Sequence, residues 1–341
     1  MFISKLFSFF GQSLAMDLGT ANTLLYTPRD GIVLNEPSVV ALDSRDGKVL
    51  AVGREAKEFL GRTPQRIVAI RPLKDGVIAD FEVTNAMIAF FIKKVIRGFN
   101  LIKPKMVICV PTGITQVEKR AVIDSGLQSG AREIRLVEEP MAAAIGAGMN
   151  IEAPIGNLVV DIGGGTTEVA VISLSAVAYS ESVRVAGDEM NEAIQRFIQE
   201  EFQLLVGENT AEKIKMTIGT ACPPSEPMTL RVQGKRIVDG NPAAVEINDS
   251  QIREAIHEPV WAIVHAVHQA MEKTPPELIT DIADNGVLLA GGGALLKGLD
   301  KLISREVQVK VNVDEDPLTT VLRGTGETLT QVKKYAHVFI N

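Results

Sequence analysis

The sequence predicts a two-domain α/β protein in which the core of the first half recurs in the second half. A strand–turn–strand segment around Asp17 is repeated around Asp161, with glycine and threonine at matching places in both copies. Apolar strands and amphipathic helices follow each copy in alternation, an order typical of α/β domains with mixed sheets. A repeat at this distance indicates duplicated domains rather than a short-period solenoid.

The composition is that of a folded α/β protein, and it excludes several other classes of protein and site. The chain has 341 residues, 46% hydrophobic and 23% charged, which suits about two ordinary domains. The net charge of −7 argues against a broad surface for nucleic acid, and we expect no such partner. Cys109 and Cys222 are far apart and lack neighbours at metal-ligand spacing. A disulfide framework and a zinc site are therefore excluded, and a reducing compartment is expected.

In the first half, residues 16–26 form the expected hairpin, because apolar runs flank a turn of small residues. The apolar strand 106–110 ends at a proline, and helical periodicity follows over 115–129. A short strand at 134–137 then leads into a helix of small residues over 141–149. This order is the strand and helix alternation of an α/β core.

In the second half, the matching hairpin covers 159–172. A long amphipathic helix is expected over 249–273, followed by an apolar strand at 286–290. Three consecutive glycines then separate this strand from a helix expected over 294–304. The same kinds of element therefore surround both hairpins.

These patterns predict the domain boundaries. We expect domain I over 16–149, with a smaller subdomain at about 31–76, and domain II over 150–324. Domain II carries its own smaller subdomain at about 187–248, because proline, glycine and charged residues interrupt the regular pattern there. Whether the last segment, about 325–341, returns to domain I is left open.

Residues 1–15 form an amphipathic N-terminal segment. Five apolar residues fall on one stripe at helical spacing, namely Phe2, Ile3, Leu6, Phe7 and Phe10. A signal peptide with cleavage after Ala15 is one interpretation, although cleavage there would leave the first strand without a lead-in. A segment packed into the core is a second. We favour the third, a helix that lies on a membrane surface.

The two hairpin turns carry the chemistry. A strand that ends in aspartate, followed by a turn of small residues, places several backbone N–H groups in one concavity, which suits phosphate oxygens. Asp17 and Asp161 stand where a carboxylate could hold a hydrated Mg²⁺ against those phosphates. One such turn is a weak signal, but two of them can clamp a polyphosphate between domains. Bare backbone at Gly291, Gly292 and Gly293 could receive a base or ribose.

These motifs, in this order, resemble the actin–chaperone–sugar-kinase superfamily of ATPases and, within it, the MreB family of bacterial actin homologues. The resemblance covers nearly the whole chain and includes the long segments 32–40, 60–64, 70–81 and 137–146. It implies an actin-like fold of two duplicated ribonuclease H-like cores. ATP, with GTP left open, and Mg²⁺ would then lie in the interdomain cleft.

The resemblance also implies roles for individual residues. Phosphate contacts come from both hairpins, through Thr20, Ala21, Asn22, Gly163, Gly164 and Gly165. Asp17 and Asp161 would hold Mg²⁺ through water. The ribose contact matches Glu212, Lys213, Ile214 and Lys215, and the adenosine motif matches Gly292, Gly293, Ala294 and Leu295.

Two residues match the pair that orients the water for hydrolysis, Glu139 and Thr166. Without the resemblance, Glu139 before Pro140 would be assigned to the start of a helix, and Glu212 with Lys215 to a surface pair. Phosphoryl transfer to water needs mainly positioning and charge neutralisation. A glutamate of ordinary pKa is a poor base at neutral pH, so we expect Glu139 to position water unless burial raises its pKa. The expected enzyme is a slow, Mg²⁺-dependent ATPase.

The function implied by the resemblance is an ATP-dependent cytoskeletal filament that governs cell shape and directs cell-wall synthesis. Its expected partners are further copies of itself in paired protofilaments, membrane lipid, and the cell-wall elongation machinery with its membrane proteins. It would lie in the cytoplasm, at the inner face of the cell membrane. Besides the N-terminal stripe, Leu101 and Ile102 in the turn-like stretch 98–104 are expected to enter the bilayer.

Other functions on the same fold remain open from the sequence. A small-molecule kinase would need an acceptor site with its own general base. A chaperone ATPase would need a peptide-binding domain after the nucleotide core, whereas little sequence follows Gly293. A shape-determining paralogue of the same family is a further alternative.

Overall fold

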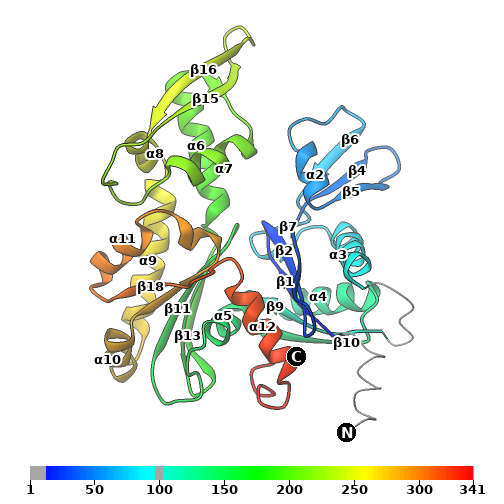
Figure 1. The fold of residues 1–341 in the computed structure, drawn as a ribbon, viewed down its shortest axis with the longest axis vertical. Coiled ribbons are helices and arrows are strands. Elements are labelled where there is room, and N and C mark those ends of the chain that lie inside the picture. Colours follow the sequence, from blue (N-terminus) through cyan, green and yellow to red (C-terminus); the bar gives the residue numbers. More distant parts are fainter. Residues whose placement is uncertain (1–12, 97–102, 341) are drawn as a thin grey trace.

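The computed structural model describes residues 13–96 and 103–340, which form two halves side by side (Figure 1). Each half is built on a five-stranded sheet, in the order β10-β9-β1-β2-β3 in the first and β13-β12-β11-β17-β18 in the second. In both sheets an antiparallel hairpin has an antiparallel strand on one side and parallel strands on the other. The duplicated α/β architecture expected from the repeat is therefore confirmed.

The strands of the two sheets correspond in order. The first sheet contains β1 (Ser13–Leu18), β2 (Asn22–Thr27), β3 (Gly31–Pro37), β9 (Lys105–Val110) and β10 (Glu133–Glu138). The second contains β11 (Asn157–Ile162), β12 (Thr167–Ser173), β13 (Ala176–Val183), β17 (Val287–Ala290) and β18 (Val311–Val313).

Helices cover both faces of the first sheet. Alternate residues of β1 point to opposite faces, so Leu14 and Met16 belong to one core and Ala15 to another. The helices α3 (Phe81–Val95) and α4 (Gln116–Gln128) pack over the first core. A capping box fixes the start of α4, because Thr115 and Glu118 bond each other's backbone N–H groups.

Two helices, α5 (Glu139–Gly146) and α12 (Thr320–Thr330), lie between the two sheets (Figure 1). Their core contains Ala15 of the first sheet and Val159 of the second, so it joins the halves. The two helix backbones are very close, since a Cβ atom on Gly324 would lie 1.8 Å from the carbonyl oxygen of Ala142. The chain end then returns to the first half, where the Ile340 N–H donates to the Leu136 carbonyl at 3.1 Å.

The second half contains further helices, which pack against the second sheet or against one another. They are α6 (Gly187–Phe202), α7 (Glu208–Ile218), α8 (Asp249–Ala255), α9 (His257–Lys273), α10 (Pro276–Asn285) and α11 (Leu299–Val307). A smaller sheet accompanies α6 and α7 and contains β14 (Leu204–Leu205), β15 (Thr229–Arg236) and β16 (Pro242–Asn248). We call residues 187–248 the α7 subdomain.

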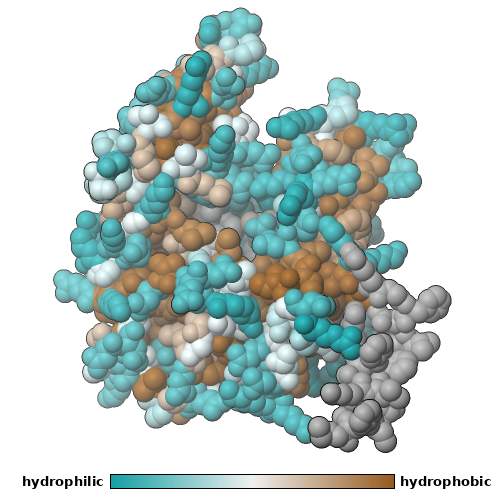
Figure 2. All heavy atoms as spheres, viewed as in Figure 1, coloured by the Kyte–Doolittle hydropathy of each residue, from teal (hydrophilic) through white to brown (hydrophobic). Residues whose placement is uncertain are grey.

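A second small unit stands on the first half, opposite the α7 subdomain (Figure 1). It contains β4 (Val40–Asp43), β5 (Val49–Val52), α2 (Arg54–Phe59) and β6 (Ile67–Ile70) around its own small core. We call residues 38–72 the α2 subdomain. The short hairpin β7 (Leu73–Lys74) and β8 (Val77–Ile78) connects it to the first half. Viewed in the same direction, the surface is hollowed between the two subdomains (Figure 2).

Three details differ from the sequence-based expectations. The segment 31–37 is the edge strand β3 of the large sheet and does not belong to the small subdomain, because it pairs with β2 along its length. The helix expected over 249–273 is two helices that meet at Ile256, where Pro259 falls in the first turn of the second. In place of the helix expected over 294–304, a 3₁₀ turn, η1 (Gly292–Leu295), precedes α11.

Within residues 13–96 and 103–340, the structure has no helix that is both long and apolar enough to cross a bilayer. The residues expected to insert into a membrane all lie outside the described part of the chain, namely Phe2, Ile3, Leu6, Phe7, Phe10, Leu101 and Ile102.

Candidate functional site

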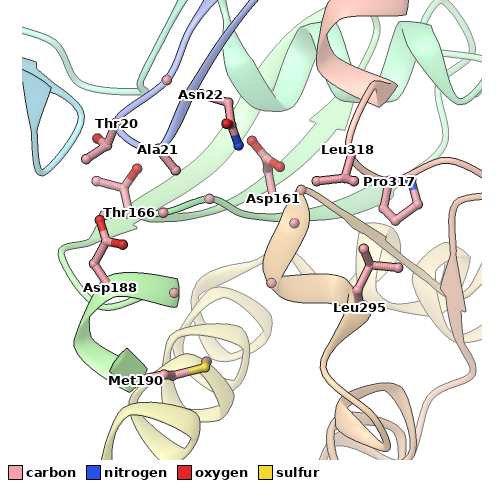
Figure 3. A pocket seen from close by; sticks show the side chains of 18 of the residues that line it. Thr20, Ala21, Asn22, Asp161, Thr166, Asp188, Met190, Leu295, Pro317 and Leu318 are labelled. Atoms are coloured by element: carbon pink, nitrogen blue, oxygen red, sulfur yellow. The ribbon is translucent and has the colours of Figure 1, made fainter. Parts of the chain in front are cut away.

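A cavity of about 540 Å³ opens between the two halves. Its size is that of a pocket for a small organic ligand. Both hairpin turns, the start of α6, one face of α7 and the glycine turn after β17 line it. The hairpin residues gather at one end of the cavity, and Leu295, Pro317 and Leu318 lie at the other (Figure 3).

The two hairpin turns have the same internal geometry. The Gly19 N–H donates to the Asn22 carbonyl at 3.1 Å, and the Gly163 N–H donates to the Thr166 carbonyl at 2.9 Å. The Ser38 hydroxyl holds the first turn from behind, because it donates to the Gly19 carbonyl at 2.6 Å. The repeated motif is thus a repeated backbone structure, as the phosphate-binding interpretation requires.

The second turn is held by the start of α6. The Gly187 N–H donates to the Gly163 carbonyl at 3.3 Å, and the Asp188 N–H donates to the Gly164 carbonyl at 2.7 Å. The first N–H groups of a helix have no partner within the helix. Here they bind the carbonyls of the turn, so the helix fixes the turn against the cavity.

Four carboxyl groups lie close together below the turns, and burial raises the pKa of each. Burial raises the pKa of Asp17 to about 6. Burial and the neighbouring Asp17 and Glu168 raise that of Asp161 to about 8. Burial and the neighbouring Glu168, Asp161 and Asp17 hold the pKa of Glu139 well above its ordinary value. Burial raises the pKa of Glu168 to about 7.

These carboxyls fit a divalent cation. None of the four forms an ion pair with a described residue, and the buried Oδ1 atom of Asp161 has no hydrogen-bond partner in the described structure. Asp17 has one weak partner, the Cys109 thiol, which donates to its Oδ1 atom at 3.3 Å. Oxygen ligands of this kind suit Mg²⁺, which would remove the repulsion between the carboxylates. Asp17 and Asp161 both line the cavity and would hold the ion.

The two residues matched to hydrolysis also line the cavity. Glu139 is the first residue of α5, and Pro140 follows it in the first turn. Thr166 is buried in the second hairpin turn, and a Cβ atom on Gly76 would lie 3.2 Å from its methyl group. The turn that contains Gly76 therefore packs closely against Thr166 at the end of the cavity that the hairpin turns line.

One face of α7 forms the wall between the two ends of the cavity. Glu212, Lys215 and Met216 line it. The Lys215 Nζ atom donates to the Gly187 carbonyl at 2.6 Å, which connects α7 to the start of α6. Burial lowers the pKa of Lys215.

The end of the cavity away from the hairpin turns has apolar walls and bare backbone. Gly291 has φ +77°, and a Cβ atom there would lie 2.3 Å from the Ile162 carbonyl oxygen, so only glycine fits. The residues that follow Gly291 in the chain also line the cavity, namely Gly292, Gly293 and Leu295. Flat apolar groups can pack on such a surface.

The structure brings together most of the predicted site residues, but not Lys213, Ile214 and Ala294, which are absent from the cavity lining. Helical periodicity explains the first two: Glu212 and Lys215 share a face of α7, whereas Lys213 points to solvent and Ile214 into the core. Ala294 is buried in the same core.

Several residues that line the cavity were not predicted from the sequence. They are Gly76, Gly187, Asp188, Met190, Asn191, Met216, Lys297, Pro317, Leu318 and Val321 among others. The segment Ala186-Gly187-Asp188-Glu189 has the polar and acidic residues of a helix start. That signal could have marked α6, but not its contact with the hairpin turn.

Comparisons with known proteins match nearly the whole chain. The family model of the MreB/Mbl protein matches residues 11–337. The chain is 51% identical over 326 residues to the cell shape-determining protein Mbl of Bacillus subtilis (strain 168), covering 95% of this chain and 98% of the relative. It is also 51% identical over 335 residues to the cell shape-determining protein MreB of Escherichia coli (strain K12), covering 97% of this chain and 96% of the relative.

Solved structures of related proteins have the same fold as this chain. The structure of MreB 5 of Spiroplasma citri bound to AMPPNP is similar with a TM-score of 0.91 and 34% identity, covering 96% of this chain and 98% of that one. The chain in a MamK double helical filament has a TM-score of 0.79 at 22% identity, with 93% and 98% covered. The fold is therefore actin-like, and the chain belongs to the MreB/Mbl family.

Proposed function

We propose that this chain is an ATP-dependent cytoskeletal protein that polymerises and slowly hydrolyses ATP. The observation that carries the proposal is the pair of matching turns that meet across one cavity, each preceded by an aspartate with a raised pKa. Family membership supports it, since related proteins are named for cell shape. A nucleotide that touches both turns would couple its phosphate state to the relative position of the halves.

The cavity suggests how a nucleotide would lie. Its phosphates would meet Thr20, Ala21 and Asn22 of the first turn and Gly163, Gly164 and Gly165 of the second, and its base would lie against Gly292, Gly293 and Leu295. The solved structures of MreB 5 of Spiroplasma citri, one with AMPPNP and one with ADP, support a nucleotide ligand. We favour ATP over GTP on the family match alone.

The chain's own residues would promote hydrolysis by orienting the attacking water. Mg²⁺, when bound at Asp17 and Asp161, would neutralise phosphate charge. Glu139 and Thr166 both line the phosphate end and would hold the attacking water. Burial raises the pKa of Glu139, so its carboxyl group would also accept a proton from the water that it positions. The slow turnover that we propose rests on the family match.

We further propose that the filaments consist of paired protofilaments, lie on the inner face of the cell membrane and guide cell-wall synthesis. Lipid and the membrane proteins of the cell-wall elongation machinery would be the partners, and the protein would be cytoplasmic. The support is the family match together with the apolar N-terminal stripe. For the domains we keep 16–149 and 150–324 as the proposed division, with β3 assigned to the large sheet.

Pelleting tests the proposal. The purified chain is incubated with ATP and Mg²⁺, with AMPPNP and Mg²⁺, or with Mg²⁺ alone, and the pellets are viewed by electron microscopy. We expect filaments with both nucleotides and few without, and filaments formed with AMPPNP should persist longer than those formed with ATP. A chain that binds ATP but forms no filaments under any of these conditions would contradict the proposed polymerisation.

A further inference from the structure

Two ion pairs join the α2 subdomain to α7. The Lys57 Nζ atom lies 2.6 Å from the Glu212 Oε2 atom, although the residues are 155 positions apart. One helical turn earlier on α7, Glu208 pairs with the Arg71 guanidinium. The two subdomains that carry these residues face each other (Figure 1), and the surface is hollowed between them (Figure 2). Both pairs are partly buried, with 29% of the Lys57 side chain and 34% of the Glu212 side chain exposed.

Glu212 differs from Glu208 because it also lines the cavity. It lies on α7 beside Lys215, between the hairpin turns and the glycine turn after β17. A carboxylate accepts hydrogen bonds and repels phosphate oxygens, so a sugar hydroxyl is the part of a nucleotide that suits this place. The Lys57 ammonium group donates a hydrogen bond to the Oε2 atom of Glu212. Within the described residues, no hydrogen-bond donor reaches the Oε1 atom of Glu212.

We propose that Lys57 is a positioning residue of the sugar site. By holding one oxygen of Glu212 it orients the other toward a ribose hydroxyl. The α2 subdomain thereby contributes to the selection of ribonucleotides without touching the nucleotide. The inference rests on the proposed function, because it requires that a nucleotide occupies the cavity.

The geometry also links sugar recognition to the closed arrangement of the two subdomains. Glu212 can be held at Oε2 only when the α2 subdomain lies against α7. A nucleotide that lacks the hydroxyl in question would gain nothing from this orientation. Lys57 should therefore affect the affinity for ATP more than the affinity for one of its deoxy analogues.

The test is the affinity of the full chain for ATP, 2′-deoxy-ATP and 3′-deoxy-ATP, each with Mg²⁺, measured by calorimetric titration. We expect Lys57→Ala to weaken ATP binding by up to about fivefold, the usual limit for a partly exposed ion pair. Binding of at least one deoxy analogue should stay unchanged, so the preference for ribose falls. Glu212→Ala should remove the same preference, and the double variant should show no further loss. Lys57→Arg should restore it in part.

Arg71→Ala is the matched control, because it breaks the neighbouring ion pair and leaves the Lys57–Glu212 pair intact. We expect it to change the affinities for all three nucleotides by one common factor. If Lys57→Ala also acts by a common factor, Lys57 only closes the cavity and the proposal is wrong. The proposal is equally wrong if Glu212→Ala leaves the ribose preference unchanged. If the unmodified chain binds none of the three nucleotides, the proposed function fails instead.

Discussion

Gly164 and Ala21 lie in contact where the two hairpin turns meet: a Cβ atom on Gly164 would lie 2.7 Å from the Cβ atom of Ala21. The two halves of the molecule approach each other at this point, at the end of the cavity that the hairpin turns line. The contact is between backbone-proximal atoms, so neither side can move away by rotating a side chain. The separation of the two turns is thus set by the absence of a side chain at Gly164.

We therefore expect Gly164→Ala to push the turns apart and to weaken nucleotide binding by at least about tenfold, the equivalent of ~1.4 kcal/mol. Calorimetric titration with ATP and Mg²⁺ measures the change. Gly207→Ala is the control, because a Cβ atom there would meet nothing within 4 Å. Equal affinities of the Gly164→Ala and unmodified chains would show that the turns do not clamp the nucleotide together.

Glu139→Ala and Thr166→Ala should lower the rate of ATP hydrolysis by about a hundredfold and leave ATP affinity within a few fold, because both residues are assigned to the water. Single-turnover hydrolysis and equilibrium binding separate the two effects. Asp161→Ala is the comparison, since it should weaken binding of the Mg²⁺ complex itself. Hydrolysis by Glu139→Ala at the unmodified rate would remove Glu139 from the mechanism.

The buried carboxyls predict how stability depends on pH when neither nucleotide nor Mg²⁺ is present. Their pKa values in the folded chain, about 6 for Asp17, 7 for Glu168 and 8 for Asp161, exceed the ordinary value of about 4 in the unfolded chain. The folded state then holds more protons, so its stability is full below pH ~4 and is lost as the pH rises through these values. We expect the free energy of unfolding to fall by at least ~1.4 kcal/mol, one pKa unit, between pH 5 and pH 8.

Urea unfolding at several pH values, with and without Mg²⁺ and ATP, measures this dependence. Asp161→Asn serves as the control, because it removes a strongly shifted group and should flatten the pH profile. Bound Mg²⁺ should flatten it as well, since it stabilises the charged carboxylates. A stability that rises between pH 5 and pH 8 in the metal-free chain would contradict the assignment.

Membrane binding by filaments should depend on apolar insertion and therefore persist at high salt. Each inserted phenylalanine, leucine or isoleucine contributes up to about 1.5–3 kcal/mol, whereas the N-terminal segment offers few positive charges in a chain of net charge −7. Co-sedimentation with vesicles should fall sharply when residues 2–10 are deleted or when Leu101→Ser is combined with Ile102→Ser. Filaments that leave the vesicles at high salt would point to an electrostatic anchor, and unchanged binding of both variants would place the anchor elsewhere.

The sequence was sufficient for the local structure of the site. Both hairpins were predictable because the order of aspartate, glycine and threonine is the same in the two copies, and this order determines the turn. The break at Ile256 was missed because amphipathic periodicity continues through it. Lys213 and Ile214 were included with Glu212 because a motif is contiguous in sequence, whereas a helix presents only one face to a cavity.

Contacts across the cavity could not be predicted in this way. Lys57 and Glu212 belong to subdomains whose own patterns contain no information on how they dock. The hydrogen bond from the Asp188 N–H group to the Gly164 carbonyl was equally unpredictable. It depends on where α6 packs relative to the second hairpin turn. Such contacts depend on the arrangement of whole units rather than on local residue patterns.

Thermal unfolding of the unmodified chain with and without ATP and Mg²⁺ tests most directly whether one nucleotide joins the two halves. A ligand that binds only the folded state adds about 2.7 kcal/mol of stability at a hundredfold excess over Kd. We predict an upward shift of the unfolding midpoint that grows with ATP concentration and is smaller in Gly164→Ala at the same ATP concentration. A midpoint that stays constant up to millimolar ATP and Mg²⁺ would contradict nucleotide binding between the two turns.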